Sequence, residues 1–305
     1  MRIYHDWQLT DPGARGASVA MGNFDGVHLG HRAVIDLARG QGPLGIVTFE
    51  PHPREFFAPA AAPFRLMNAE ARANRLAKLG IERLYELPFD AALAGLTPHD
   101  FAAQVLARGL GVRHVVVGRD FCFGKGRTGT AETLRELGAE HGFAVTLADL
   151  VRAGGREISS TAIRQALSDG QPRDAAAMLG HWHRIEGPVI HGEKRGRELG
   201  FPTANMSVAG LHLPRLGVYA VKVDVLTGPQ AGSYMGAASL GVRPMFGENS
   251  PNLETFLLDF RGDLYGQHLS VAFVDFLRPE MKFDGLPALI RQMNADCDRA
   301  RDILS

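Results

Sequence analysis

The sequence predicts two domains of different fold class, an α/β domain with a parallel sheet followed by an all-β domain that ends in a helix. Three observations support this division. The chain has 305 residues, which is long for one hydrophobic core and suits two domains. Its first half alternates short apolar runs with helical patterns, whereas its second half consists of strand-like runs separated by glycine and proline. We place the boundary after residue 182, so that residues 1–182 and 183–305 form the two domains.

Apolar and β-branched runs predict the strands of the first domain, and HVVVG at 114–118 is typical of a buried parallel strand. The other expected strands are 18–21, 44–49, 81–87 and 144–150. Helical patterns lie between them at 31–39, 68–78, from 97 onward and at about 130–141. Gly40 ends the first helix, Asn68 caps the second, and Thr97-Pro98 opens the third with an N-cap hydroxyl and a first-turn proline. Such repeated strand–helix units imply a parallel sheet with helices on both faces.

Five strand-like runs follow in the second domain, with no long helical pattern between them. They are RIEGPVIHG (184–192), GVYAVKVDV (217–225), GSYMGAASLG (232–241), LETFLLDF (253–260) and HLSVAFVDFL (268–277). Runs of this kind favour an antiparallel barrel or sandwich. Residues 286–304 predict one amphipathic helix, because Leu289, Ile290, Met293 and Cys297 follow helical spacing.

The charge balance and the cysteine content exclude several classes of protein. Basic and acidic residues number 33 each, and proteins that bind nucleic acid usually carry a basic excess. Cys122 and Cys297 lie far apart, which argues against a disulfide framework or a structural zinc site. The N-terminal segment lacks the apolar core of a signal peptide, and no apolar run is long enough to span a bilayer. We therefore expect a cytoplasmic enzyme with no nucleic-acid or membrane partner.

GNFDGVHLGH at 22–31 follows a predicted strand and opens a predicted helix. This arrangement presents backbone N–H groups and the positive end of a helix dipole to a phosphate. The three glycines of the segment remove side-chain bulk where a nucleotide must come close. His28 and His31 can both face one ligand and stabilise charge on a transferring phosphoryl group. A tight turn with incidental histidines is the alternative interpretation.

Three further segments could complete this first site. In EISSTAIRQAL (157–167), Arg164 could bind ATP phosphates in a bidentate manner. Helix capping alone also explains the hydroxyl residues Ser159, Ser160 and Thr161. GRDFCFGKGRTG (118–129) suits a mobile loop over an anionic aromatic ligand. A plain surface loop with solvated cations is the alternative there, and the aromatic residues argue against it, because exposed rings are unusual without a partner. TFEPHP (48–53) ends a strand at the edge where open parallel sheets bind ligands.

GNFDGVHLGH, TFEPHP, VVVGRDFCFGKGRTG and ISSTAIR, in this order, resemble the adenylyltransferase half of the prokaryotic bifunctional riboflavin kinase/FAD synthetase family. The resemblance implies a Rossmann-like nucleotidylyltransferase domain that joins ATP and FMN to give FAD and pyrophosphate. It implies catalytic roles for His28, His31 and Arg164. The residues implied to bind ATP are Gly22, Asn23, Phe24, Gly30, Ser159, Ser160 and Thr161. Those implied to bind the flavin are His52, Pro53, Asp120, Phe121, Phe123 and Gly124.

A second candidate site begins in GRELGFPTANMSV at 196–208. Oxygen ligands from Thr203 and Asn205 suit a hard cation such as Mg²⁺, which usually accompanies phosphate. The alternative is that Pro-Thr-Ala-Asn forms a simple turn. Glu254 lies in an apolar strand-like run that could bury it, and its carboxylate could be a salt-bridge partner or a base that takes a hydroxyl proton.

GRELGFPTAN, LPRLGVYAVKV, NLETFLLDF and LYGQHLSVAFVDFLRPEMKFD resemble the riboflavin kinase half of the same family, which extends the resemblance from residue 18 to about 300. It implies a six-stranded antiparallel β-barrel with a C-terminal helix packed on it. The implied reaction transfers the γ-phosphoryl group of ATP to the terminal ribityl hydroxyl of riboflavin. The implied roles are a base at Glu254, ATP binding at Gly196, Gly200, Thr203 and Asn205, Mg²⁺ binding at Thr203 and Asn205, and flavin binding at Arg278.

SLGVRPMF at 239–246 departs from the pattern of that family at Ser239 and Met245. Met245 removes a hydroxyl, which puts a polar ligand role there in doubt. Because Thr203, Asn205 and Glu254 are present, we expect kinase activity to persist.

Two other readings of the chain remain open. The first domain could adenylylate a different substrate while the barrel only binds ligand, but the polar residues of the second site argue against an inert barrel. Alternatively, the chain could be a non-catalytic flavin or nucleotide sensor that binds RNA or a regulator, which the neutral charge balance disfavours. The leading hypothesis is one enzyme that uses riboflavin, FMN and ATP as small-molecule substrates. We expect it to act as a monomer or weak homo-oligomer.

Overall fold

The structure, a computed structural model, divides the chain into two compact units. The described residues are 1–9, 11–149, 152–153, 156–191, 201–245 and 248–305. Only the backbone is described at 152–153, 156–157, 242–245 and 248–250. The first unit comprises Met1–Ala62 and Arg72–Ile158, and the second comprises Pro63–Ala71 and Ser159–Ser305. By its contacts, the helical segment that follows Ile158 therefore packs with the second unit.

A six-stranded parallel sheet forms the centre of the first unit, in the order β1-β4-β3-β2-β5-β8. The strands are β1 Arg2–Tyr4, β2 Ser18–Met21, β3 Leu44–Glu50, β4 Arg83–Pro88, β5 His114–Gly118 and β8 Ala144–Ala148. The chain runs outward from β2 through β3 to β4, then returns to place β5 on the other side of β2. The strand order thus reverses between β2 and β5, where open α/β sheets bind ligands at the carboxyl ends of their strands.

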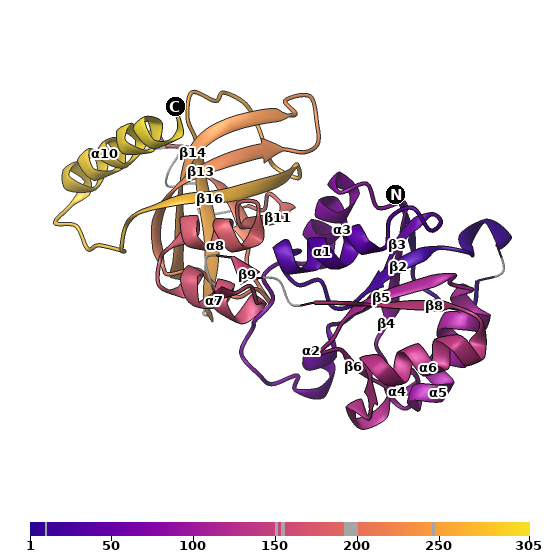
Figure 1. The fold of residues 1–305 in the computed structure, drawn as a ribbon. Coiled ribbons are helices and arrows are strands. Elements are labelled where there is room, and N and C mark those ends of the chain that lie inside the picture. The colour runs from indigo at the N-terminus through magenta and orange to yellow at the C-terminus, as the bar shows by residue number, and fades with distance from the viewer. Residues whose placement is uncertain (10, 150–151, 154–155, 192–200, 246–247) are drawn as a thin grey trace. The chain divides into compact units, whose positions relative to one another are not determined.

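Helices cover both faces of this sheet, with α1 and α3 on one face and α4, α5 and α6 on the other (Figure 1). The helices are α1 Leu29–Leu37, α2 Pro53–Phe57, α3 Ala69–Lys78, α4 Ala91–Ala94, α5 Pro98–Asp100, η2 Phe101–Leu110 and α6 Ala131–His141. The expected caps are confirmed, since Asn68 Oδ1 accepts the N–H of Ala71 at 2.8 Å and the Thr97 hydroxyl accepts that of Asp100 at 3.1 Å. The predicted α/β fold class is confirmed.

Short elements that the sequence did not predict complete the first unit. They are β1, the 3-10 turns η1 Pro12–Ala14 and η3 Lys125–Arg127, and the hairpins β6 Cys122–Phe123 with β7 Gly129–Thr130 and β9 Arg152–Ala153 with β10 Arg156–Glu157. The β6–β7 hairpin follows β5 and therefore lies on one side of the reversal in strand order.

A six-stranded antiparallel barrel forms the second unit, in the order β11-β16-β13-β14-β15-β12. The strands are β11 Arg184–Pro188, β12 Ala204–Ser207, β13 Gly217–Val225, β14 Gly232–Met245, β15 Glu248–Leu257 and β16 His268–Arg278. A bridge between Ile190 and Asn205 brings the two edge strands together, so the barrel is nearly closed. The predicted barrel is confirmed, but residues 204–207 form a strand where the turn alternative expected none.

Side chains of β13 alternate between the barrel interior and the C-terminal helix α10, Leu286–Leu304. Tyr219, Val221 and Val223 fill the interior, whereas Val218 and Ala220 pack against Cys297 and other residues of α10. Because successive side chains of a strand point to opposite faces, β13 contributes to both the barrel core and the apolar cluster under α10. Two more helices, α7 Ser160–Ser168 and α8 Pro172–Leu179, belong to this unit.

Candidate active sites

The turn between β2 and α1 has an uncommon backbone conformation. Phe24, Gly26 and Val27 have φ angles of 52°, 89° and 44°. Glycine adopts such angles easily, but a β-branched residue such as valine rarely does. Phe24 and Val27 are only 1% and 0% exposed, so packing of their side chains holds the turn in place. Backbone strain that is enforced in this way is concentrated at functional sites.

His28 and His31 cap α1 reciprocally, which fixes both rings. His28 Nδ1 accepts the backbone N–H of His31, and His31 Nδ1 accepts that of His28, each at 3.3 Å. The rings stack with their centroids 3.6 Å apart. Because each Nδ1 is an acceptor, the neutral ring carries its proton on Nε2 and can donate it to a ligand.

Burial lowers the pKa of His31 well below its usual value, and the adjacent His28 lowers it further. His31 is therefore neutral near pH 7. A neutral imidazole offers a hydrogen-bond donor rather than a fixed positive charge, and a bound phosphate would favour its protonation.

Gly30 is required by the position of the His28 ring. A Cβ atom on Gly30 would lie 3.0 Å from His28 Cε1 and 3.1 Å from His28 Nδ1. It would also lie 3.8 Å from the carbonyl oxygen of Ile158, the last residue of the first unit. Any side chain here would therefore displace the stacked imidazoles.

Gly22 and Asn23 lead into the turn and are tied to β3. The N–H of Gly22 donates to the carbonyl of Val47 at 3.1 Å, and the Thr48 hydroxyl donates to the carbonyl of Asn23 at 3.2 Å. A Cβ on Gly22 would make only an ordinary contact, 3.7 Å from the Phe24 ring. A side chain would therefore be tolerated sterically at position 22 but not at position 30.

His52 and Pro53 form the start of α2, just after β3. His52 Nδ1 accepts the N–H of Arg54 at 3.1 Å, and Glu55 accepts the N–H of His52 at 3.1 Å. The segment thus lies at the carboxyl edge of the sheet, as expected, and His52 caps a helix there.

The β6–β7 hairpin corrects one premise of the sequence argument. Phe123 is 7% exposed and packs 5.7 Å from Phe101 in the core, and Phe121 stacks on Phe123 at 5.9 Å. The expectation of exposed aromatic rings in this loop is therefore wrong for Phe123, whose ring anchors the hairpin. Gly124 lies against Pro98, where a Cβ would be 2.8 Å from the proline ring, and Asp120 is exposed.

The segment from Ser159 to Arg164 begins α7. Ser159 caps the helix through the N–H of Ala162 at 3.2 Å, and Ser160 and Thr161 form its first turn. Arg164 Nε donates to the carbonyl of Phe64 at 2.5 Å, and its guanidinium lies 5.3 Å from the Phe64 ring centroid. These residues belong to the second unit, whereas the two histidines belong to the first.

Strand register brings together the polar residues of the second site. Glu254 on β15 pairs with Asn205 on β12 and with Ser239 on β14. Asn205 is 7% exposed, and its Nδ2 donates to the carbonyl of Thr203 at 3.4 Å. Asn205, Glu254 and Ser239 thus lie in one row across neighbouring strands, and Thr203 precedes Asn205 by two residues.

Asn252 is a site residue that the sequence argument missed. Its Nδ2 donates to Asn205 Oδ1 at 3.2 Å and to Glu254 Oε1 at 3.4 Å. The only sequence signal is its spacing of two from Glu254, which places both side chains on the same face of a strand. Asn252 thus links the amide and the carboxylate of the row.

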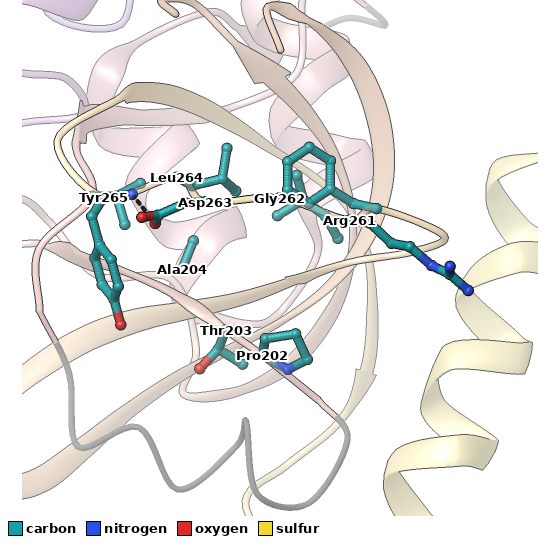
Figure 2. Close-up of a pocket in the computed structure, with 11 residues that line it drawn as sticks. Pro202, Thr203, Ala204, Arg261, Gly262, Asp263, Leu264 and Tyr265 are labelled. Carbon is teal, nitrogen blue, oxygen red and sulfur yellow. Dashed lines mark hydrogen bonds between the residues drawn. The ribbon is translucent and has the colours of Figure 1, made fainter. Parts of the chain in front are cut away.

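Two cavities meet at Thr203, which lines both. The first, of about 200 Å³, lies between the Pro202–Ala204 segment and the loop 260–265 (Figure 2). In this loop the Asp263 carboxylate accepts the N–H of Tyr265 at 3.0 Å, and the Arg261 side chain extends away from the other labelled residues (Figure 2). The polar side chains of Thr203 and Asp263 lie among apolar ones such as those of Leu257, Phe260 and Leu264, so this cavity offers a ligand both polar and apolar contacts.

The second cavity, of about 170 Å³, has Glu254 and Ser239 on its wall. Aromatic and thioether side chains line much of the rest, including those of Phe201, Phe256, Phe283, Met281 and Met293. A cavity with aromatic walls and a few polar groups suits a flat ring system. Arg278 also lines it, and its guanidinium pairs with Asp296 of α10 through contacts of 2.8 Å and 3.0 Å.

Some predicted residues cannot be placed. Gly196 and Gly200 lie outside the described residues, and the Met245 side chain is outside the description as well. Within the described part of the chain, no helix is both long and apolar enough to cross a membrane.

Comparisons with known proteins match each half of the chain to a protein family. The profile of the FAD synthetase family matches residues 11–162, and that of the riboflavin kinase family matches residues 179–304. A bifunctional riboflavin kinase/FMN adenylyltransferase from Pseudomonas fluorescens is 42% identical over 95% of this chain and 94% of its own length. The enzymes of the same description from Escherichia coli K12 and Bacillus subtilis are 38% and 36% identical, over 96% and 98% of this chain and 95% and 96% of their own lengths.

A solved structure shares the fold over nearly the whole chain. It is described as a macrolide-efflux protein from Streptococcus pneumoniae and is 30% identical, with a TM-score of 0.82. The match covers 99% of this chain and 98% of the other.

Proposed function

The chain belongs to the family of bifunctional riboflavin kinase/FMN adenylyltransferases, which phosphorylate riboflavin to FMN and adenylylate FMN to FAD, and from this premise we propose which residues carry each step. The FAD synthetase step is assigned to residues 1–182 and the riboflavin kinase step to residues 183–305. The extents of the two family matches support this division.

In the FAD synthetase step, the FMN phosphate attacks the α-phosphorus of ATP and pyrophosphate leaves. An ionised phosphate needs no general base, so the site must position both substrates and stabilise the charge of the leaving group. His28 and His31 donate Nε2–H to the phosphates, and Gly22, Asn23 and Phe24 form the wall of the turn. The reciprocal capping of the rings supports this role, because each Nδ1 accepts a backbone N–H and the proton of each neutral imidazole is therefore on Nε2.

Further ATP contacts are assigned to the start of α7. The backbone amides of Ser160 and Thr161 lie in its first turn, where the helix dipole favours an anion. Arg164 adds a cation, and Ser159 holds the helix end. The sequence resemblance supports this assignment, because ISSTAIR is one of the four segments that carry it.

The FMN site of the first domain is assigned to residues at the carboxyl edge of its sheet. His52 and Pro53 follow β3, whereas Asp120, Phe121 and Gly124 follow β5, so they flank the reversal in strand order. Phe123 has the separate task of anchoring the hairpin in the core. Its burial supports that task and leaves Phe121 as the ring closer to solvent.

In the kinase step, the ribityl hydroxyl of riboflavin attacks the γ-phosphorus of ATP and must lose a proton. Glu254 accepts that proton as the general base. The cavity with aromatic walls takes the isoalloxazine ring, with Arg278 at its wall, and the cavity at loop 260–265 takes the nucleotide. Thr203 lines both cavities, so it would lie where the two substrates meet.

ATP-using enzymes of these families generally need a divalent metal, and Mg²⁺ fits the donors of the second site. Thr203 and Asn205 supply oxygen atoms, which this ion prefers. The amide nitrogen of Asn205 donates to the Thr203 carbonyl, and Oδ1 accepts one hydrogen bond from Asn252, so Oδ1 would bind the ion through its second lone pair. When bound, Mg²⁺ would neutralise charge on the ATP phosphates. Gly196 and Gly200 are assigned to the same nucleotide site on sequence grounds alone.

One observation carries the kinase assignment: Glu254 pairs with Asn205 across two strands and lines the cavity with aromatic walls. The test is chromatography of the flavins formed from riboflavin, ATP and Mg²⁺ by the wild-type chain and by Glu254→Gln. We expect FMN and then FAD from the wild type, and neither from the variant. FMN formation by Glu254→Gln at the wild-type rate would refute the assignment.

A further inference from the structure

A cluster of metal-ligating side chains lies in the first unit, on the α5 and α6 side of the sheet. His99 belongs to α5, and Glu140 and His141 end α6. One potential ligand atom from each residue lies within 4.8 Å of the other two. Within the part of the chain that the structure describes, this is the one group of three such residues. We propose that it binds a borderline divalent cation of the zinc type, separately from the Mg²⁺ of the ATP sites.

Two separations within the group are close to those between ligands around a small cation. His99 Nε2 lies 3.3 Å from Glu140 Oε1, and His141 Nε2 lies 3.9 Å from the same oxygen. Ligands that bind tetrahedral Zn²⁺ at about 2.0–2.2 Å lie about 3.3–3.6 Å from one another. One pair already has this separation, and the second needs a shift of about half an ångström, within reach of side-chain rotation.

The His141 ring supplies a second observation that points to a ligand. Its Nε2 is a buried atom that has no hydrogen-bond partner among the described residues. The side chain is 18% exposed, and its ring meets the His99 ring edge to face with centroids 5.0 Å apart. A buried nitrogen of this kind costs free energy unless something binds it, and a cation at this position would do so.

The donor set determines which cation would bind. Imidazole nitrogen suits Zn²⁺, Ni²⁺ or Cu²⁺, whereas Mg²⁺ prefers oxygen ligands. Two imidazoles and one carboxylate leave a fourth position for water in a tetrahedral site. Because His99 and Glu140 are each 57% exposed, the site is open to solvent and can exchange its ion.

A bound cation would join α5 to α6 on either side of the β6–β7 hairpin. The N–H of Lys125 in the hairpin donates to the carbonyl of Leu96 just before α5, at 2.7 Å, and Gly124 lies against Pro98. On the other side, β7 leads directly into α6. The cation would therefore stiffen the frame of the hairpin and raise the thermal unfolding midpoint of the first unit.

The experiment is calorimetric titration of Zn²⁺ into the metal-stripped full-length protein with excess Mg²⁺ present. Each variant is first checked by circular dichroism without metal. We expect His99→Gln and His141→Gln to weaken one equivalent of Zn²⁺ binding by more than about tenfold. We also expect both to lose the zinc-dependent rise in unfolding midpoint.

His268→Gln is the matched control, because His268 Nδ1 lies 2.8 Å from Glu70 in a pair outside this cluster. It should bind Zn²⁺ as the wild type does. The proposal is overturned if the wild type takes up no Zn²⁺, or if His99→Gln and His141→Gln bind it as the wild type does. In that case the cluster is an ordinary histidine–glutamate ion pair.

Discussion

The two candidate sites fix their polar side chains in different ways. In the first unit, a strained turn and a helix start hold His28 and His31 through backbone amides. In the barrel, register between strands aligns Asn205, Ser239 and Glu254. The first site therefore depends on a few local contacts, whereas the second depends on pairing between distant parts of the sequence.

The difference matches the nucleophile that each step uses. An FMN phosphate is already ionised, and the first site offers imidazole hydrogen-bond donors but needs no base. A ribityl hydroxyl must lose a proton, and the barrel presents the Glu254 carboxylate in the wall of its cavity with aromatic walls. We infer that a substitution in one site abolishes the reaction of that site and leaves the other reaction unchanged.

Glu254→Gln should have the largest effect. The amide keeps the shape of the side chain but cannot accept a proton, so the riboflavin kinase rate should fall by about 10²- to 10⁴-fold. Steady-state phosphorylation of riboflavin measures this loss. FMN adenylylation by the same protein should remain within twofold of wild type, and a parallel loss there would show that the sites are coupled.

His31→Ala should be next, with the opposite selectivity. It removes one donor to the phosphates, and such a loss costs about 10²- to 10³-fold in rate. FAD formation from supplied FMN measures it, with riboflavin phosphorylation as the internal control. Adenylylation near the wild-type rate in both His31→Ala and the double variant His28→Ala/His31→Ala would remove the histidines from the mechanism.

Gly30→Ala tests whether the stacked geometry itself matters. The added methyl group would meet the His28 ring at 3.0–3.1 Å and displace it. We expect adenylylation to fall by about ten- to a hundredfold, because small displacements of catalytic groups are costly. Gly22→Ala is the control, since its Cβ would meet only the Phe24 ring at 3.7 Å. Equal effects of the two substitutions would contradict the steric argument.

Asn252→Ala should have a smaller effect, confined to the kinase. It removes the hydrogen bonds to Asn205 and Glu254, each at the long end of the normal range. A loss of about 1 kcal/mol corresponds to roughly a fivefold lower kcat. Riboflavin phosphorylation with saturating substrates checks this, and Asn252→Asp, which cannot donate, should not restore the rate. Full activity of both variants would show that Asn252 does not position the row.

The last prediction concerns folding of the barrel unit in acid and leaves both activities at pH 7 unchanged. Burial lowers the pKa of His183 to about 3, with His181 and His212 as further causes. The unfolded chain then binds a proton below its ordinary pKa near 6.5 while the folded chain does not, so stability falls as pH falls from 6.5 toward 3. The slope is up to about 1.4 kcal/mol per pH unit. Denaturant unfolding at pH 7 and 5.5 measures it, and His183→Gln should reduce the difference. An unchanged difference would contradict the assignment.

The sequence predicted the local elements of the fold well, because periodicity and caps are local signals. The strands 18–21 and 114–118 and the caps at Asn68 and Thr97 are confirmed. The strand Ala204–Ser207 was not predicted, because Pro-Thr-Ala-Asn is a turn signal and the strand exists only through its pairing with β15.

Prediction of the sites failed where tertiary packing decides the environment. The ring of Phe123 was treated as exposed because it lies in a predicted surface loop, but it packs beside Phe101. Asn252 carries no motif of its own, and its contacts with Asn205 arise only when β12 and β15 pair. Asn205 and Glu254 of the polar row were therefore predictable from the sequence, whereas Asn252 and the geometry of the row were not.

The most direct test of the two-site account is a complementation assay. Glu254→Gln and His28→Ala/His31→Ala are each incubated with riboflavin, ATP and Mg²⁺, separately and then mixed, and the flavins are separated by chromatography. We predict no FMN from the first variant, FMN without FAD from the second, and FAD from the mixture, because FMN made by one protein can be used by the other. No FAD from the mixture, or FMN lost from the histidine variant, would contradict the account.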